Sequence, residues 1–125
     1  MSKTILIVED NVLDAQLYRD VLDAGGYRTL WAAEGSTALC LAQEHRPDLI
    51  LMDIGLSDVS GLEVTHWIKR EKDLRHIPVI AVTGFAMEGD KERILEHGCD
   101  AYVSKPVSIG GLLIAVQQYL PEPDD

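Results

Sequence analysis

Five mostly apolar runs alternate with helical segments along this chain, and this alternation restricts its fold more than any other feature. The clearest runs are too short for a helix that must hide one stripe, and they lack the polar alternation of a half-exposed strand. Both properties are typical of strands that are buried on both faces. The runs cover residues 4–8, 27–33, 48–53, 77–82 and 101–103.

The intervening segments carry apolar residues at helical spacing, and their ends are marked by suitable residues. Asn11 is a good N-cap, and Gly25 and Gly26 follow the end of the first helical pattern. We expect further helices over about 36–44, after Gly61, over roughly 87–97, and from about Ile109. Strict β-α alternation predicts an α/β fold with helices on both faces of a parallel sheet. We expect the flavodoxin-like (βα)5 doubly wound form with strand order 2-1-3-4-5.

Length and charge narrow the class of protein. The 125 residues are predicted to form a single domain over 1–125, with a core of about 4–120, a short polar tail and no effector domain. The formal charge of −10 disfavours nucleic acids and anionic membranes. No apolar run reaches the ~18 residues of a membrane span, so we expect a cytoplasmic protein. Cys40 and Cys99 have no metal-ligand spacing and are expected to be reduced.

Ionisable or hydroxyl side chains stand where four of the expected strands end. Glu9 and Asp10 follow the first strand, Asp53 ends the third, Thr83 follows the fourth, and Lys105 comes shortly after the fifth. The carboxyl ends of parallel strands lie along one edge of the sheet, which is where such folds bind ligands. We therefore expect three carboxylates, a hydroxyl and an ammonium group in one crevice.

Three carboxylates in one crevice repel one another unless a cation lies between them. Mg²⁺ (or Mn²⁺) fits this oxygen-rich set, with Asp10 and Asp53 as direct ligands and Glu9 acting through water. The backbone carbonyl of Gly55 is a further candidate ligand. Together with the cation, the Lys105 ammonium would complete a receptor for a phosphoryl group, with Thr83 as a further donor. Asp53, the most central carboxylate, is the expected nucleophile for an aspartyl phosphate.

These motifs together resemble the receiver domain of two-component response regulators across essentially the whole chain. The matching segments are residues 5–11, 48–53, 81–83 and 104–106. The resemblance implies that Asp53 accepts a phosphoryl group from a histidine kinase or a histidine phosphotransferase. It also implies a phosphoacceptor domain that assists its own phosphorylation and dephosphorylation, rather than an enzyme, and a monomer or weak dimer that signals to a downstream protein target.

The resemblance further implies roles for residues around the crevice. Thr83 and Tyr102 would form the conformational switch, and the bond between Lys105 and Pro106 would be cis, as proline tolerates. Phe85 stands at a position that, like position 55, tunes the lifetime of the phosphate in the family.

The chain departs from the family pattern in the loop after Asp53. Ser57 stands where a proline is usual, Ser60 where an acid or asparagine is usual, and Gly84 where alanine is more frequent. None of these positions is expected to contact the phosphoryl group, so the chemistry should persist.

Within the family, residues 61–65, 76–79, 84–90 and 98–106 most resemble single-domain regulators of the cell cycle and of polar development. That resemblance implies polar histidine kinases as partners and recruitment to cell poles. A chemotaxis or phytochrome-linked receiver and a phosphorylation-independent pseudo-receiver adaptor are the alternatives. An Asp-nucleophile phosphatase would need a second Asp where Gly55 stands. A flavodoxin would need a phosphate loop where Glu9 and Asp10 stand.

Overall fold

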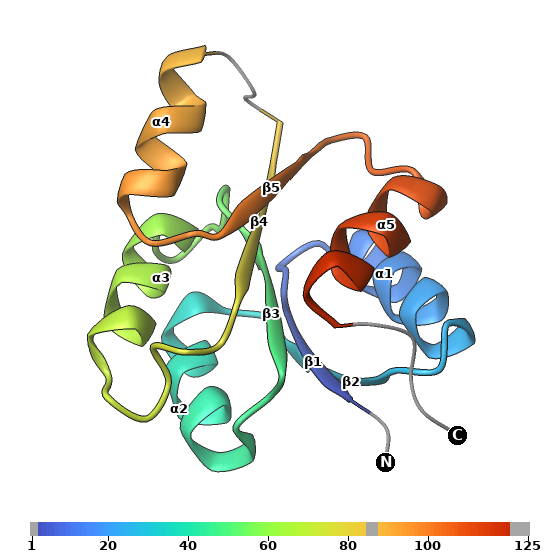
Figure 1. The fold of residues 1–125 in the computed structure, drawn as a ribbon, viewed down its shortest axis with the longest axis horizontal. Helices are drawn as coiled ribbons and strands as arrows, with labels where there is room; N and C mark the ends of the chain where they lie inside the picture. Colours follow the sequence, from blue (N-terminus) through green and yellow to red (C-terminus); the bar gives the residue numbers. More distant parts are fainter. Residues whose placement is uncertain (1–2, 85–87, 121–125) are drawn as a thin grey trace.

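The computed structural model describes residues 3–84 and 88–120, which form a five-stranded parallel sheet between two layers of helices (Figure 1). The strand order is β2-β1-β3-β4-β5, as predicted. The strands are β1 (Thr4–Val8), β2 (Arg28–Ala32), β3 (Leu49–Asp53), β4 (Val79–Thr83) and β5 (Ala101–Ser104). The helices are α1 (Val12–Ala24), α2 (Gly35–His45), α3 (Gly61–Arg70), α4 (Glu88–Glu96) and α5 (Ile109–Tyr119). None of these helices is long and apolar enough to cross a bilayer.

Two hydrophobic cores hold the sheet, one on each face. Alternate residues of β1, β3 and β4 pack under α2, α3 and α4, with Ala38, Ile68 and Ile94 among the buried helical residues. The remaining strand residues pack under α1 and α5, where Leu22 and Val116 are fully buried. The apolar runs of the central strands are therefore continuous because both of their faces are covered.

The register of the sheet brings the carboxyl ends of the central strands to one edge. Val8 pairs with Met52, and Asp53 pairs with Val82. Thr83 pairs with Ser104 at the same edge. Consequently, the residues that follow β1 and β5 lie close in space to the residues that end β3 and β4.

Several expected strand boundaries are wrong by one or two residues. β4 begins at Val79 and includes Thr83, which was expected in the exit loop. Pro78 lies just before the strand and contributes only its carbonyl, which accepts the amide hydrogen of Ile50 at 2.9 Å. Proline has no N–H to donate, so an inner strand excludes it. Asp48 precedes β3, and its carboxylate accepts the amide of Thr4 at 2.8 Å.

The outer strands β2 and β5 are not buried on both faces. In β2 only Ala32 is buried, and no residue of β5 is buried. Each has a neighbour on one side only, so their side chains lie partly in water. The expected helix over 87–97 begins at Glu88 in the structure, and Met87 lies outside the described residues.

The predicted helix caps of α1 are present. The Asn11 side chain accepts the amide of Asp14 at 3.0 Å, and Gly26 has a φ of 93°, in the region that favours glycine. At the end of α2, Arg46 adopts a left-handed conformation with a φ of 46° directly before Pro47. This agrees with proline's exclusion of α-helical geometry at the preceding residue.

Candidate functional site

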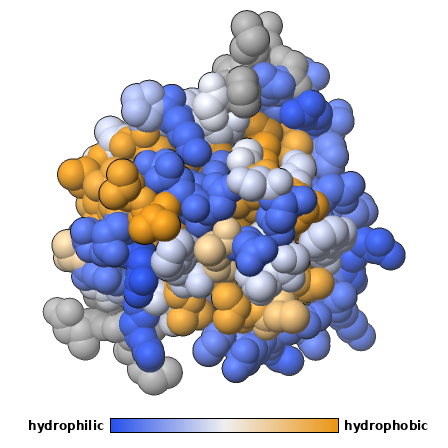
Figure 2. Space-filling model, turned by 180° about the vertical axis from the view of Figure 1, so that it is seen from behind, coloured by the Kyte–Doolittle hydropathy of each residue, from blue (hydrophilic) through white to orange (hydrophobic). Residues whose placement is uncertain are grey.

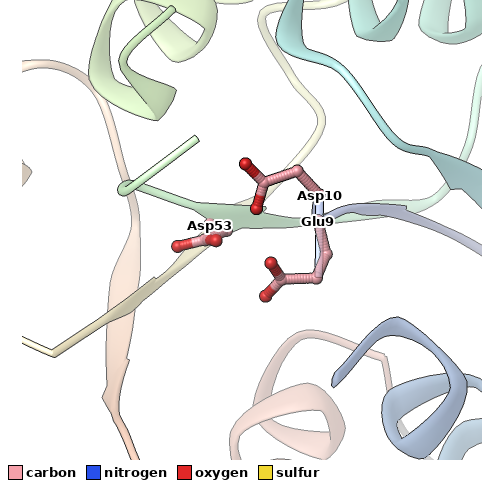
Figure 3. A group of neighbouring side chains, drawn as sticks. All are labelled: Glu9, Asp10 and Asp53. Atoms are coloured by element: carbon pink, nitrogen blue, oxygen red, sulfur yellow. The ribbon is translucent and has the colours of Figure 1, made fainter. Parts of the chain in front are cut away.

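Three carboxylates meet at the carboxyl edge of β1 and β3. Figure 3 shows Glu9 and Asp10, which follow β1, converging with Asp53 at the end of β3. One oxygen from each residue lies within 4.8 Å of the others. Glu9 and Asp53 are almost fully buried, at 1% and 3% exposure, whereas Asp10 is partly exposed. The structure therefore brings three acidic side chains together at a place where solvent reaches the cluster only from the side of Asp10.

Lys105 is the cation that faces these carboxylates. Its Nζ lies 3.4 Å from Asp53 Oδ1 and 3.7 Å from Glu9 Oε1. Its amide donates to the Thr83 carbonyl at 2.8 Å, and the Lys105–Pro106 peptide bond is cis. Partial burial alone would lower the pKa of Lys105, but the negative charges of Asp53 and Glu9 outweigh it and raise the pKa. Lys105 is therefore held in its charged form.

One positive charge does not satisfy three carboxylates. Among the described residues, Glu9 Oε1 is a buried oxygen without a hydrogen-bond partner. Burial, reinforced by the neighbouring Asp53 carboxylate, raises the pKa of Glu9 to about 8. Unsatisfied oxygen and excess negative charge fit a small divalent cation such as Mg²⁺, which prefers hard oxygen ligands. The residues at this edge thus match the predicted metal.

Glu9→Gln is expected to stabilise the metal-free protein at alkaline pH by about 2 kcal/mol. The folded wild type holds the Glu9 proton up to a pKa of about 8, while the unfolded chain releases it near the ordinary pKa of 4.5. The free energy of unfolding of the wild type should therefore fall as pH rises through that window, because the folded state binds more protons there than the unfolded state does. Glutamine has no such proton and keeps an acceptor for the Asn11 amide.

Urea unfolding of both proteins in EDTA, from pH 5 to pH 9, measures this difference. The two free energies of unfolding should nearly meet at pH 5 and diverge towards pH 9. If the free energies of unfolding of the two proteins changed in parallel over the whole pH range, the pKa of Glu9 would not be raised in the folded protein.

The loop after Asp53 folds back onto the carboxylates. The Gly55 amide donates to Asp53 Oδ1 at 3.0 Å. A Cβ on Gly55 would lie 3.7 Å from that oxygen, which is ordinary contact, so this position tolerates a side chain. The observed interaction of Gly55 with Asp53 is through its amide, while its carbonyl stays a predicted metal ligand.

Sequence reasoning missed two residues that touch the site. The Ser57 amide donates to Asp10 Oδ2 at 2.8 Å, and the Ser57 hydroxyl donates to the same oxygen. In the sequence, Ser57 stands out only as a departure from the family pattern. The Trp31 Nε1–H donates to the Glu9 carbonyl at 2.7 Å. The signal for these two contacts in the sequence is weak. A serine hydroxyl and an indole N–H donate to whichever acceptor the fold places near them, so the residue type alone does not identify the partner.

The two expected switch residues lie on neighbouring strands, with Thr83 at the end of β4 and Tyr102 two residues further back, opposite Ala81. Thr83, the last residue of β4, is 3% exposed. Tyr102 on β5 is partly buried, and the Lys91 Nζ lies 5.8 Å from the centre of its ring. Phe85, the expected residue for phosphate lifetime, lies outside the described residues.

Sequence comparison matches residues 5–117 to the response regulator receiver domain. The chain belongs to the response regulator receiver family. It is 58% identical over 120 residues to the polar-differentiation response regulator DivK of Brucella anthropi, covering 96% of this chain and 98% of that protein. It is 57% identical to DivK of Brucella ovis over the same shares. These relatives confirm the narrower resemblance seen in the sequence.

Solved structures agree with this family. The receiver domain of the sensor histidine kinase PA1611 from Pseudomonas aeruginosa is 34% identical, with a TM-score of 0.87 over 95% of this chain and 98% of that one. That structure has a magnesium ion coordinated in its active-site cleft. The chemotaxis protein CheY4 of Vibrio cholerae is 25% identical, with a TM-score of 0.92 over 96% of this chain and all of that one.

Proposed function

We propose that this receiver accepts a phosphoryl group on Asp53 from a phosphohistidine of a histidine kinase or phosphotransferase. The observation that carries the proposal is the buried Asp53 carboxylate, held between Lys105 at 3.4 Å and two further carboxylates. In the transfer, an Asp53 oxygen forms a bond to phosphorus as the N–P bond breaks. The electron pair of that bond returns to the imidazole nitrogen of the donor.

We propose different tasks for the two oxygens of Asp53. Oδ1 accepts the Gly55 amide at 3.0 Å and faces Lys105 Nζ. We assign the attack on phosphorus to the other oxygen, Oδ2. Lys105 then provides a fixed positive charge close to where the phosphoryl oxygens arrive, in a site that excludes water on one side.

Asp10, Asp53 and the Gly55 carbonyl are the proposed direct ligands of Mg²⁺ or Mn²⁺, with Glu9 acting through water. Support comes from the converging carboxylates and from the buried Glu9 Oε1 without a hydrogen-bond partner among the described residues. When bound, the cation neutralises the carboxylates and the phosphoryl oxygens and so lowers the electrostatic barrier to transfer. The Pseudomonas receiver described above provides a precedent for magnesium in this cleft.

A protein that donates a phosphoryl group must approach the edge beside α1. Val12, Leu13 and Leu17 of α1 are apolar and exposed there, with Leu13 at 81% exposure. Leu17 also lines a hollow together with Lys105 and Pro106. Figure 2 shows hydrophobic side chains gathered on the side of the molecule where α1 lies. We propose that the histidine-bearing partner packs against these side chains.

The output is proposed to pass through Thr83 and Tyr102. Thr83 would bind a phosphoryl oxygen, and Tyr102 would move inward and change the surface formed by α4, β5 and α5. Such a switch needs a coupling free energy of ~1–3 kcal/mol. We further propose that this chain regulates polar differentiation, because its relatives are named for that role. Control of the cell cycle and action in the cytoplasm through a downstream protein are parts of the proposal that rest on the resemblance in the sequence.

Incubation with acetyl phosphate tests the proposal. With Mg²⁺ present, the intact mass should increase by one phosphoryl group, and peptide mapping should locate it on Asp53. Excess EDTA should suppress the adduct by at least roughly tenfold, since the cation offsets the repulsion between the donor and the carboxylates. An unmodified mass in Mg²⁺ would contradict the proposal and favour a pseudo-receiver adaptor.

A further inference from the structure

Ser57 holds the most exposed of the three carboxylates in place. Its amide and its hydroxyl both donate to Oδ2 of Asp10, the amide at 2.8 Å. Residues 10 and 57 are separated by 47 positions in the chain, so this contact joins the β1 edge to the loop that follows β3. Both hydrogen bonds are accepted by the same oxygen of the Asp10 carboxylate.

Asp10 needs such support because it lies beside a second carboxylate, that of Asp53, which repels it. Glu9 and Asp53 lie within 4.8 Å and are confined by burial, whereas Asp10 is partly exposed. A partly exposed carboxylate beside another lowers its energy by turning towards water. Two donors on one oxygen oppose that rotation and leave the other oxygen of Asp10 available.

The loop that carries Ser57 is itself anchored at several points. The amide of Ile54 donates to Val82 at 3.1 Å. Asp58 Oδ1 and Oδ2 accept the amides of Gly35 and Ser36, each at 3.0 Å, at the start of α2. Since the residue next to Ser57 is tied to another helix, the two Ser57 donors have a fixed position from which to orient Asp10.

We propose that Ser57 is a positioning residue for the metal site, which holds Asp10 in the orientation that binds the divalent cation. This inference rests on the proposed metal site, and it assigns a task to a residue that departs from the usual pattern of the family. Outer hydrogen-bond partners of metal ligands typically change metal affinity by about 10–100-fold when they are removed.

Isothermal titration with Mg²⁺ tests this role on the whole chain, with Ser57→Ala and Ser57→Thr compared with the wild type. Ser57→Ala should weaken Mg²⁺ binding by about tenfold, the lower end of that range, because the amide donor stays. Ser57→Thr keeps the hydroxyl and should bind within about threefold of the wild type. Thermal unfolding of all three proteins in EDTA checks that the fold is unchanged.

Equal or tighter Mg²⁺ binding by Ser57→Ala, beside a wild type that binds Mg²⁺, would overturn the positioning role and leave the metal site standing. A wild type that binds no Mg²⁺ would overturn the proposed metal site and the role of Ser57 with it. Weak binding by Ser57→Thr as well as Ser57→Ala would show that the hydroxyl does not preserve the affinity, and would also reject the inference.

Discussion

Replacing Asp53 by asparagine is expected to lower phosphorylation by acetyl phosphate by more than roughly a thousandfold. The amide is nearly isosteric with the carboxylate but has no charged oxygen to attack phosphorus. The loss should not come from unfolding, because the substitution removes one of three crowded negative charges and leaves Glu9 to pair with Lys105 at 3.7 Å. Intact-mass measurement over time gives the rate of adduct formation.

Asp48→Asn is a matched control for this experiment. Asp48 immediately precedes the same strand, at its opposite end, where its carboxylate accepts the Thr4 amide. This variant should accept a phosphoryl group at close to the wild-type rate. Continued formation of the adduct in Asp53→Asn, at a rate near that of the wild type, would place the phosphoacceptor elsewhere.

Gly61→Ala is expected to destabilise the protein by about 3 kcal/mol and to impair phosphorylation as well. A Cβ at position 61 would lie 2.2 Å from the carbonyl oxygen of Asp53 and 2.8 Å from the Cα of Ile54. Both atoms belong to the backbone, which cannot yield as a flexible side chain can. The start of α3 therefore passes so close to the backbone of Asp53, the proposed phosphoacceptor, that only glycine fits, and added bulk must displace the loop that follows it.

Gly110→Ala provides the comparison within the same molecule. Gly110 also lies in the first turn of a helix, α5, but a Cβ there would meet no atom within 4 Å. This variant should be more stable than the wild type by about 0.5–1 kcal/mol, because alanine is the better helix former. Urea unfolding of both variants measures the contrast. Similar small effects at the two positions would show that the backbone at Asp53 relaxes around the new methyl group.

The overall fold could be predicted because its determinants are local in the sequence. Apolar runs at β1, β3 and β4 are long enough to be read directly, and caps such as Asn11 require only a hydrogen bond three residues away. Once the order of elements is known, the handedness of the crossovers leaves few arrangements of a parallel sheet. The predictions for the half-exposed strands β2 and β5 were less accurate, because the exposure of their side chains depends on their place at the edges of the sheet.

The candidate site could also be predicted in part. Glu9, Asp10, Asp53 and Lys105 follow or end strands, and parallel strands bring their carboxyl ends together regardless of the details of packing. The separations between their side chains could not be derived in this way. They depend on the register of the sheet and on the path of each loop.

The sequence by itself determined the order of strands and the identity of the residues at the carboxyl edge, because both follow from neighbours along the chain. Only the tertiary structure decided which groups restrain those residues. The Ser57 donors on Asp10 and the fit of Gly61 against Asp53 depend on how the loop after β3 folds back. Such contacts join segments that are distant in the sequence or that lie on either side of a loop. Their energies change when a distance changes by a few tenths of an ångström, and residue patterns do not encode distances so finely.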